Sequence, residues 1–383
     1  MVRRLSVVGL FAGIGGIELG FERAGHRAEL LCEVDSAAQK VLRARFPVVP
    51  LHDDVCSLRS LPKVDVVAAG FPCQDLSQAG GTAGINGSKS GLVDEVFRLV
   101  AKPKASPTWL LIENVPFMLH LDRGRAMAHL TSALNELGFA WAYRVVDTRA
   151  FGLPQRRQRV ILLASRTEDP RSVLFDDDAP SNEQTDTTGR ACGFYWTEGL
   201  KGLGWAVDAV PTLKGGSTIG IPSAPAVWAV DDSIGTPHIE DAERLQGFPA
   251  LWTEPSVDDP ARRNGPRWKL VGNAVSVPVA EWAGRRLAQA SASAVGEYEL
   301  LQPGESWPRA AWGKDGKAHR VNAGLWPEQC PYQHLDEFLK HPLRPLSDRA
   351  LAGFLQRSER SSLRFPEGLL DAARRQRRQL PTA

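Results

Sequence analysis

Fold class is decided by residues 5–16, which read Leu-Ser-Val-Val-Gly-Leu-Phe-Ala-Gly-Ile-Gly-Gly. The apolar, β-branched start predicts a buried strand, and the glycines that follow predict a tight turn. A helical pattern comes next, running from Ile17 to Phe21 with a stop at Gly25. Strand, glycine turn and helix are the opening of a doubly wound α/β sheet, in which the helix N-terminus offers unpaired N–H groups to a ligand. Because Glu18 stands where a dinucleotide fingerprint has its third glycine, the turn argues against a dehydrogenase.

The composition is that of a globular chain. Its length of 383 residues, at about 150 residues per domain, predicts two domains or three. The 46 basic and 44 acidic side chains leave a net charge of +2, so a nucleic-acid surface would have to come from local clustering. The five cysteines have no CxxC spacing and the eight histidines no metal-ligand spacing, so we expect neither a disulfide framework nor a metal site. No membrane-length apolar run and no signal peptide is evident, which predicts a cytoplasmic protein without a membrane partner.

Two acidic residues follow the next predicted strands. Glu33 ends the apolar run 28–32, about twenty residues after the glycines, where a carboxylate can accept hydrogen bonds from ribose hydroxyls. Asp54 follows another predicted strand end and could accept from an adenine amino group. The alternative is an ordinary α/β turn with acids on its surface.

A cysteine and a glutamate end two further predicted strands. The run 63–70 leads through Phe-Pro into Cys73, and residues 109–112 lead into Glu113. Ligands bind at this edge of an open α/β sheet, so a nucleophile and a proton-holding group are predicted there. A lone cysteine is otherwise a small buried hydrophobe, and the glutamate could be an exposed loop acid. The Gly- and Ser-rich stretch 75–91 predicts either a lid or a disordered insertion.

Five motifs in one order identify a resemblance. They are Phe11-Ala12-Gly13-Ile14-Gly15-Gly16, Pro72-Cys73-Gln74, Glu113-Asn114-Val115, Gln155-Arg156-Arg157-Gln158-Arg159 and Gly272-Asn273-Ala274-Val275. Over residues 4–290 the chain resembles the DNA cytosine-5 methyltransferases. The resemblance implies a Rossmann-like methyltransferase sheet that uses S-adenosylmethionine, releases S-adenosylhomocysteine and needs no metal.

The resemblance also implies a role for each motif residue. Cofactor contacts fall on Phe11, Gly13, Gly15, Glu33, Asp54 and Asn273. The thiolate of Cys73 would add to carbon 6 of a flipped cytosine, and Glu113 would hold the ring N3 and the exocyclic amine. Arg157 and Arg159 match the arginines that bind the base O2 and organise the cysteine and the glutamate.

Target recognition is expected in a smaller, mainly β domain at 165–264. The catalytic domain would span 1–164 and be completed by 265–295, which leaves 296–383 as an extension that could contact DNA, bind a partner or support the fold. The expected DNA contacts are Ser77, Gln78, Thr212 and Arg244. Basic residues before the last motif would either touch phosphates or form a solvated face; they are Arg262, Arg263, Arg267 and Lys269.

These observations predict a monomeric enzyme that methylates cytosine in a short sequence of double-stranded DNA. The resemblance implies service in restriction–modification or another phage-defence system, with cognate restriction or defence proteins as partners. Two alternatives stay open, a tRNA cytosine methyltransferase of the same fold and a non-catalytic DNA-binding partner. The run from Pro72 to Ser77 and the long insert favour the DNA enzyme over the first, and the presence of Cys73, Glu113 and both arginines favours it over the second.

Overall fold

The computed structural model describes residues 3–71, 91–102, 107–216, 224–257, 265–289, 298–302 and 304–380. Most of the expected lid, and with it Cys73, Ser77 and Gln78, lies outside these residues. No helix among the described residues has the length and hydropathy of a membrane span.

The chain forms two compact units and crosses between them several times. Unit 1 comprises Met1–Ala150, Gln158–Ser181 and Val275–Gln329, and unit 2 comprises Phe151–Arg157, Asn182–Ala274 and Cys330–Ala383. This division differs from the expected one in four respects. Residues 151–157 lie in unit 2 although they were expected in the catalytic domain, and residues 165–181 lie in unit 1 although they were expected in the recognition domain. Residues 265–274 lie in unit 2, and the expected extension is divided between the units instead of forming a domain of its own.

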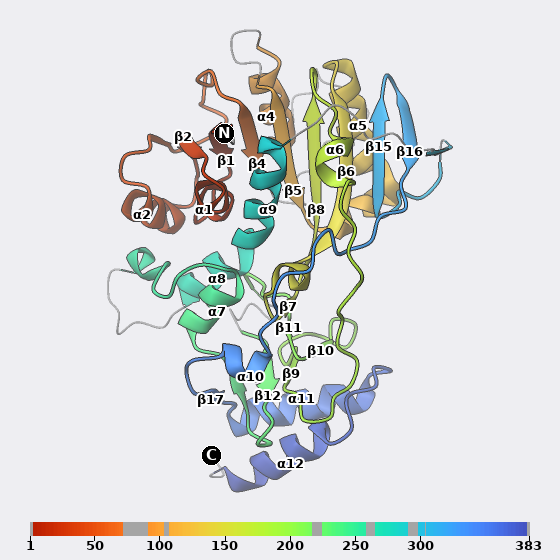
Figure 1. Ribbon diagram of the computed structural model, residues 1–383. Helices are drawn as coiled ribbons and strands as arrows, with labels where there is room; N and C mark the ends of the chain where they lie inside the picture. The colour runs from red at the N-terminus through yellow and green to blue at the C-terminus, as the bar shows by residue number, and fades with distance from the viewer. Residues whose placement is uncertain are drawn as a thin grey trace. The chain divides into compact units, whose positions relative to one another are not determined.

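Unit 1 is built on a ten-stranded mixed sheet, in the order β14-β16-β15-β6-β8-β5-β4-β1-β2-β3 (Figure 1). The five strands from β5 to β3 run parallel, and β8 pairs antiparallel with both β5 and β6. These strands are β1 Ser6–Leu10, β2 Arg27–Cys32, β3 Leu51–His52, β4 Val66–Ala69, β5 Trp109–Asn114, β6 Ala140–Asp147 and β8 Gln158–Ser165. They confirm the predicted doubly wound sheet, and β5 continues far enough to include Glu113 and Asn114.

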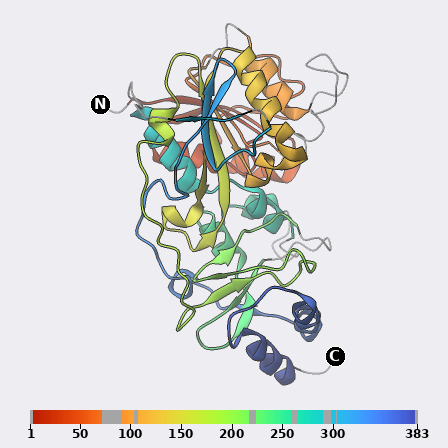
Figure 2. The ribbon, with the colours of Figure 1, turned by 90° about the vertical axis from the view of Figure 1, so that its right-hand side faces the viewer.

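Helices cover both faces of this sheet because alternate strand residues are apolar and buried on each side. Side chains of α4 and α5 share one core cluster with Val8, Val67 and Leu110 of the strands. On the other face α1 packs against α9. Figure 2 shows the teal α9 and the orange and gold α4 and α5 on opposite sides of the sheet. The helices of unit 1 are α1 Gly16–Arg23, α2 Ser36–Arg45, α4 Leu92–Val100, α5 Arg125–Glu136, α6 Arg171–Leu174 and α9 Val277–Ala288, with short 3-10 turns η3 Pro116–Leu119 and η4 Leu121–Gly124 and, at the junction with unit 2, η5 Thr148–Phe151.

The first part of the expected extension completes the edge of this sheet. β15 (Ala310–Lys314) pairs antiparallel with β6, and β16 (Lys317–Arg320) and β14 (Glu299–Leu300) continue outward. The fully buried Arg144 of β6 donates to the carbonyl oxygen of Gly324 at 2.8 Å and also pairs with Asp178. Residues 298–329 therefore support the catalytic sheet, which is one of the roles left open by the sequence.

Unit 2 contains a five-stranded antiparallel sheet, β10-β9-β12-β13-β17, and a two-stranded parallel pair, β11-β7. The strands are β7 Gln155–Arg156, β9 Cys192–Phe194, β10 Trp205–Val207, β11 Val210–Pro211, β12 Ala226–Trp228, β13 Ile234–Thr236 and β17 Arg344–Pro345. The short strands and turns predicted for this stretch are confirmed, and β17 comes from the extension.

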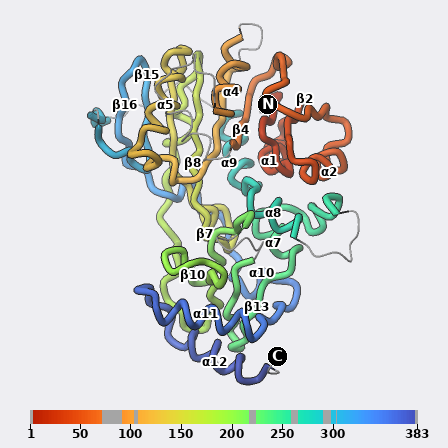
Figure 3. Tube along the Cα trace, turned by 180° about the vertical axis from the view of Figure 1, so that it is seen from behind, coloured from red at the N-terminus to blue at the C-terminus, as the bar shows by residue number. Residues whose placement is uncertain are grey.

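Five helices pack against these strands. The extension supplies α11 and α12, which share a core cluster with Phe194, Ala226 and Ile234 and lie side by side (Figure 3). A second cluster joins α7, α8 and α10 to Val210 and Val227. The helices of unit 2 are α7 Ile239–Leu245, α8 Gly265–Asn273, α10 Leu335–Phe338, α11 Asp348–Arg360 and α12 Leu369–Gln379, with η6 at Glu254–Ser256.

Three basic residues of unit 2 pair with carboxylates of the same unit. Arg262 and Arg263 lie outside the described residues, whereas the buried Arg267 donates to Glu243 Oε1 at 2.8 Å. In α12, Arg375 and Arg377 pair with Asp232 and Asp348. Neutralised in this way, these side chains support the unit's own structure.

Candidate active site

The glycine turn predicted after the first strand adopts left-handed backbone conformations. Phe11, Gly13 and Gly15 have φ angles of 56°, 57° and 84°. Left-handed geometry is unusual for a residue with a side chain, so Phe11 is the strained position of the three. Gly15 caps α1, and a Cβ there would lie 2.3 Å from the ring of Phe46. Within the turn, the Ala12 N–H donates to the Cys32 carbonyl oxygen at 3.0 Å and the Gly15 N–H to the Ala12 carbonyl oxygen at 2.9 Å, which fixes the backbone at the carboxyl end of β1.

Glu33 is fixed at the end of the neighbouring strand β2. Its Oε2 accepts from the Gly13 N–H at 2.7 Å, and its Oε1 accepts from the Asp35 N–H at 2.8 Å. Each carboxylate oxygen has two lone pairs, so each can still accept one hydroxyl hydrogen. The glycine turn and the acid at position 33 thus form one hydrogen-bonded unit.

Asp54 follows the next strand along the same edge. Backbone pairing of β3 continues past β2, since the Glu33 N–H donates to the His52 carbonyl oxygen at 3.1 Å. Oδ1 of Asp54 accepts from the Cys56 N–H at 2.9 Å, which holds the half-buried side chain in a turn. The two predicted cofactor acids therefore lie at adjacent strand ends.

A buried acid–base pair lies at the end of β5. The Nε of Arg159 in β8 lies 2.9 Å from Oε1 of Glu113, and the two residues are 9% and 7% exposed. A Cβ at Gly70, the residue after β4, would lie 3.6 Å from Oε2 of Glu113. The pair therefore lies beside the chain that leads to Cys73. A guanidinium this close fixes the direction of the glutamate side chain.

Asn114 holds the same segment, which leads from Gly70 to Cys73, through its side-chain amide. Its Nδ2 donates to the carbonyl oxygen of Phe71 at 3.1 Å, and its Oδ1 accepts from the Val115 N–H at 2.8 Å. The ring of Phe71 meets that of Phe11 edge to face, with centroids 6.2 Å apart. The sequence motif includes Asn114 but predicts no role for it. Its buried amide bonds to both Phe71 and Val115, which identifies Asn114 as a positioning residue.

Arg157 lies in unit 2 and has different partners from Arg159. Its guanidinium donates to the carbonyl oxygens of Leu213, Gly272 and Ala274 at 2.9, 3.3 and 2.6 Å. Only 1% of the residue is exposed. It therefore ties the segment of Thr212 and Leu213 to the last of the five motifs.

The other predicted residues of unit 2 surround this arginine or lie in α7. The hydroxyl of Thr212 donates to the Arg156 carbonyl oxygen at 2.8 Å, and exposed Asn273 lies against Gly215. Arg244 pairs with Asp241 and donates to the Phe338 carbonyl oxygen at 3.0 Å. The described contacts of Arg244 thus hold α7 to the extension.

Glu18 is a buried carboxyl group behind the glycine turn. It is 1% exposed, and its Oε1 lies 1.8 Å from where a Cβ of Gly9 would be, so only glycine fits in β1 at that point. The pKa of Glu18 is raised to about 8. Burial is the main cause, a backbone hydrogen bond opposes it, and the nearby carboxylates Glu22 and Glu33 add to it. The sequence pattern marks Glu18 only as a departure from the dinucleotide fingerprint. Gly9, a glycine inside the preceding strand, is the feature of the sequence that indicates a close neighbour at that point.

Comparison with known proteins agrees with this geometry. Residues 5–193 match the family described as C-5 cytosine-specific DNA methylase. The chain is 52% identical over 368 residues to the Type II methyltransferase M2.BsuMI of Bacillus subtilis, covering 93% of this chain and 94% of the relative. The chain belongs to the C-5 cytosine-specific DNA methylases.

Other relatives of the methylase extend the likeness. It is 29% identical over 306 residues to the Type II methyltransferase M.HaeII of Haemophilus aegyptius, covering 73% of this chain and 91% of the relative. Among solved structures, the Entamoeba histolytica methyltransferase EhMeth aligns with a TM-score of 0.51 at 14% identity, over 74% of this chain and 98% of that one. The structural likeness supports the predicted α/β fold alone. Family membership makes the chain a DNA cytosine-5 methyltransferase, as the five motifs predicted.

Proposed function

We propose that this methylase transfers a methyl group from S-adenosylmethionine to carbon 5 of a cytosine flipped out of duplex DNA, through a covalent bond to Cys73. The observation that carries the proposal is the buried pair of Glu113 and Arg159 beside Gly70. An ion pair at the carboxyl end of two central strands, next to the chain that leads to a cysteine, suits ring activation better than fold stability.

The cofactor fits the residues at the first three strand ends. Glu33 keeps lone pairs for two ribose hydroxyls while it holds Gly13, and Asp54 has a carboxylate oxygen for the adenine amino group. Phe11 offers a ring to the adenine, and the backbone of Gly13 and Gly15 would face the methionine part. The resemblance also makes Asn273 of unit 2 a predicted cofactor contact. Bound there, the cofactor supplies an electrophilic methyl group.

Protein side chains then activate the cytosine. The Cys73 thiolate forms a bond to carbon 6, and the ring electrons move to carbon 5, which becomes nucleophilic enough to accept the methyl group. Glu113 holds N3 and the exocyclic amine, which offsets the negative charge that develops on the ring. Arg159 orients Glu113 and lies within reach of the base O2. Loss of the carbon 5 proton and release of the Cys73 thiolate restore the aromatic ring.

Target recognition is assigned to unit 2. Its short strands and loops can present side chains to base edges in the major groove, and Thr212 lies on the segment that Arg157 holds in place. Arg157 would contribute to recognition by holding this segment in place, and Arg244 by holding α7 in place. Ser77 and Gln78 would lie near the space left by the flipped base.

A role in restriction–modification follows from the likeness to a relative named as a Type II methyltransferase over nearly its whole length. Methylation of one short sequence would protect host DNA from a nuclease of matching specificity. Such a nuclease is the expected partner.

Cytosine-5 sequencing of DNA from cells that express the wild type, Cys73→Ala or Cys330→Ala tests the proposal. Cys330 is a partly exposed cysteine outside the five motifs and serves as the matched control. The wild type and the control should methylate one short motif, and Cys73→Ala should leave it unmodified. Methylation by Cys73→Ala would remove this residue as the nucleophile, and a mark found only on RNA of the same cells would move the substrate to RNA.

A further inference from the structure

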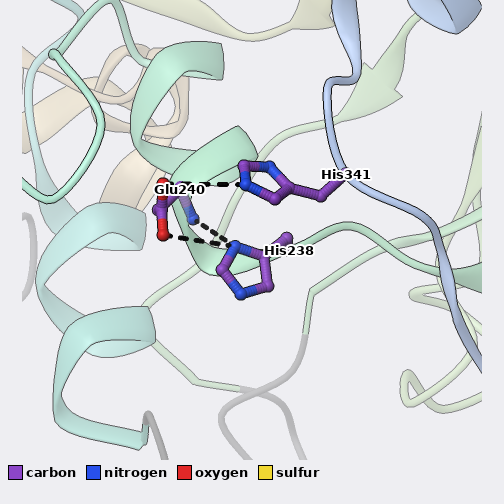
Figure 4. Close-up of side chains that lie close together, drawn as sticks. All are labelled: His238, Glu240 and His341. Carbon is purple, nitrogen blue, oxygen red and sulfur yellow. Dashed lines mark hydrogen bonds and ion pairs between the residues drawn. The ribbon is translucent and has the colours of Figure 1, made fainter. Parts of the chain in front are cut away.

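Two histidines and a glutamate converge in unit 2, although 103 residues separate the histidines in the chain (Figure 4). His238 precedes α7, Glu240 lies in its first turn, and His341 comes from the extension. One ligand atom from each lies within 4.8 Å of the other two. The spacing of histidines along the sequence could not reveal this cluster, because half of it comes from the far end of the chain.

His341 is oriented as a metal-binding histidine is. Its Nδ1 lies 3.2 Å from Oδ1 of the fully buried Asp241, and its Nε2 lies 3.7 Å from Oε2 of Glu240. A carboxylate on Nδ1 fixes the proton there and leaves the Nε2 lone pair for a metal. Asp241 is itself held by the Lys340 and His341 N–H groups at 3.1 Å, so this orientation is rigid.

His238 approaches the same carboxylate from the other oxygen. Its Nδ1 lies 3.8 Å from Oε1 of Glu240, and its ring stacks on that of His341 with centroids 4.4 Å apart. The same Nδ1 accepts a long hydrogen bond, 3.4 Å, from the Glu240 N–H. A metal would take this lone pair in place of the amide, which is the weaker of the two partners.

We propose that His238, Glu240 and His341 bind one zinc ion, with water in the fourth position, and that the ion fastens the extension to α7. Two imidazoles and a carboxylate are a ligand set that zinc uses, in which three protein ligands leave one position open. Zinc–ligand bonds are about 2.0–2.2 Å long, so the ligand atoms of the three side chains would have to move about 1 Å toward one another. Both histidine side chains are more than a third exposed, so the ion has a path in and the rings have room to move.

The site joins elements that matter for recognition. α7 carries Arg244, which also contacts Phe338 of the extension. Zinc would add a further fastening between α7 and residues 338–343, beside those that Arg244 and Asp241 already provide. The effect is on the stability of unit 2, and it is independent of methyl transfer.

Zinc titration of the full-length chain, stripped of metal with a chelator, tests the site. A chromogenic competitor gives stoichiometry and affinity, and thermal unfolding with and without zinc gives the change in Tm. The variants are His341→Asn, which keeps a donor for Asp241, and His238→Ser, which keeps a side-chain cap for α7. His120→Asn, at an exposed histidine of unit 1, is the matched control.

The wild type and the control should bind one equivalent of zinc and gain Tm with it. Each of the other two variants should bind at least tenfold more weakly and gain nothing. The proposal is overturned if the metal-free wild type takes up no stoichiometric zinc, or if His341→Asn and His238→Ser bind it as the wild type does.

Discussion

Buried charge is used differently at the strand ends of unit 1 and in the interior of unit 2. Glu243 in unit 2 accepts from the Thr253 N–H at 2.9 Å, the Trp252 N–H at 3.2 Å and Arg267 at 2.8 Å. Glu113 in unit 1 has one ion-pair partner among the described residues, and Glu33 has one backbone donor on each oxygen. Glu113 and Glu243 are both buried, so burial alone does not distinguish them. What differs is the number of hydrogen bonds that each acid can still accept: the protein saturates Glu243 and leaves Glu113 and Glu33 able to accept more.

Removal of residues 330–383 should have the largest effect. It takes away α11 and α12 and the groups that satisfy two fully buried acids of unit 2, since Asp208 binds His334 and the Leu335 N–H, and Asp241 binds the backbone of 340 and 341. An unpaired buried carboxylate costs several kcal/mol, so unit 2 should not fold. Limited proteolysis and thermal unfolding measure this. A truncated chain with the Tm and protease resistance of the full-length protein would contradict the view that the extension is structural.

Substitution of the unsaturated acid should lower turnover much further than its effect on stability explains, although it also leaves the buried Arg159 without its carboxylate. Glu113→Gln keeps the shape of the side chain but loses the charge and the proton-holding group. Loss of such a group reduces turnover by about 10²–10⁴-fold. Methyl transfer from labelled cofactor to DNA gives kcat, and thermal unfolding gives stability. A normal kcat, or a fall explained entirely by a lower Tm, would place Glu113 with the saturated acids.

Much of unit 1 was predictable because its signals are local. Strand periodicity, a glycine turn and acids at strand ends give β1, β2, β4, β5 and the residues that follow them. The left-handed Phe11 was not predictable, because tertiary packing overrides its ordinary preference. Neither was the difference between Arg157 and Arg159, two residues apart, since their partners come from distant segments.

Unit 2 was less predictable because many of its contacts join segments that are distant in the sequence. Its expected β character is confirmed by the short strands β9 to β13. Its boundaries differ from those expected because β17 and α10–α12 pack onto it from the end of the chain. Contacts that join residues more than a hundred positions apart leave no periodic trace in one sequence.

Removal of the charge of Glu243 should lower the stability of unit 2 and leave methyl transfer unchanged. Glu243→Gln leaves Arg267 buried without its carboxylate, which costs about 3–5 kcal/mol of unfolding free energy. The double variant Glu243→Leu/Arg267→Met should recover a large part of this loss. Denaturant unfolding measures both. If Glu243→Gln lowers kcat at a temperature where it stays folded, the network belongs to the catalytic machinery and the comparison fails.

The effect that is smallest per unit of pH should come from Glu18, a buried acid of unit 1 that is neutral at low pH. Its pKa is about 8 in the folded protein against an ordinary value of 4.5. The neutral form is therefore favoured by folding, so its contribution to stability is complete below pH 4.5 and is lost as the pH rises to 8. The free energy of unfolding should fall by about 1 kcal/mol per pH unit in this window, and Glu18→Gln should remove that slope.

Denaturant titrations between pH 5 and 8 measure the slope, with Glu168→Gln at an exposed position of unit 1 as the control. Equal slopes for the wild type and both variants would mean that Glu18 titrates at an ordinary pH.

Pairing between β6 and β15 delays the completion of unit 1 until late in synthesis. Tyr143 in β6 donates to the carbonyl oxygen of Pro308, 165 residues further along the chain, and at 5–20 residues per second the ribosome needs roughly 10–30 s to make that interval. Throughout this time the backbone of β6 is an open sheet edge, which is a template for association with a second nascent chain. The arrival of residues 310–314 closes that edge, so their timing sets how long each newly made molecule is exposed to aggregation.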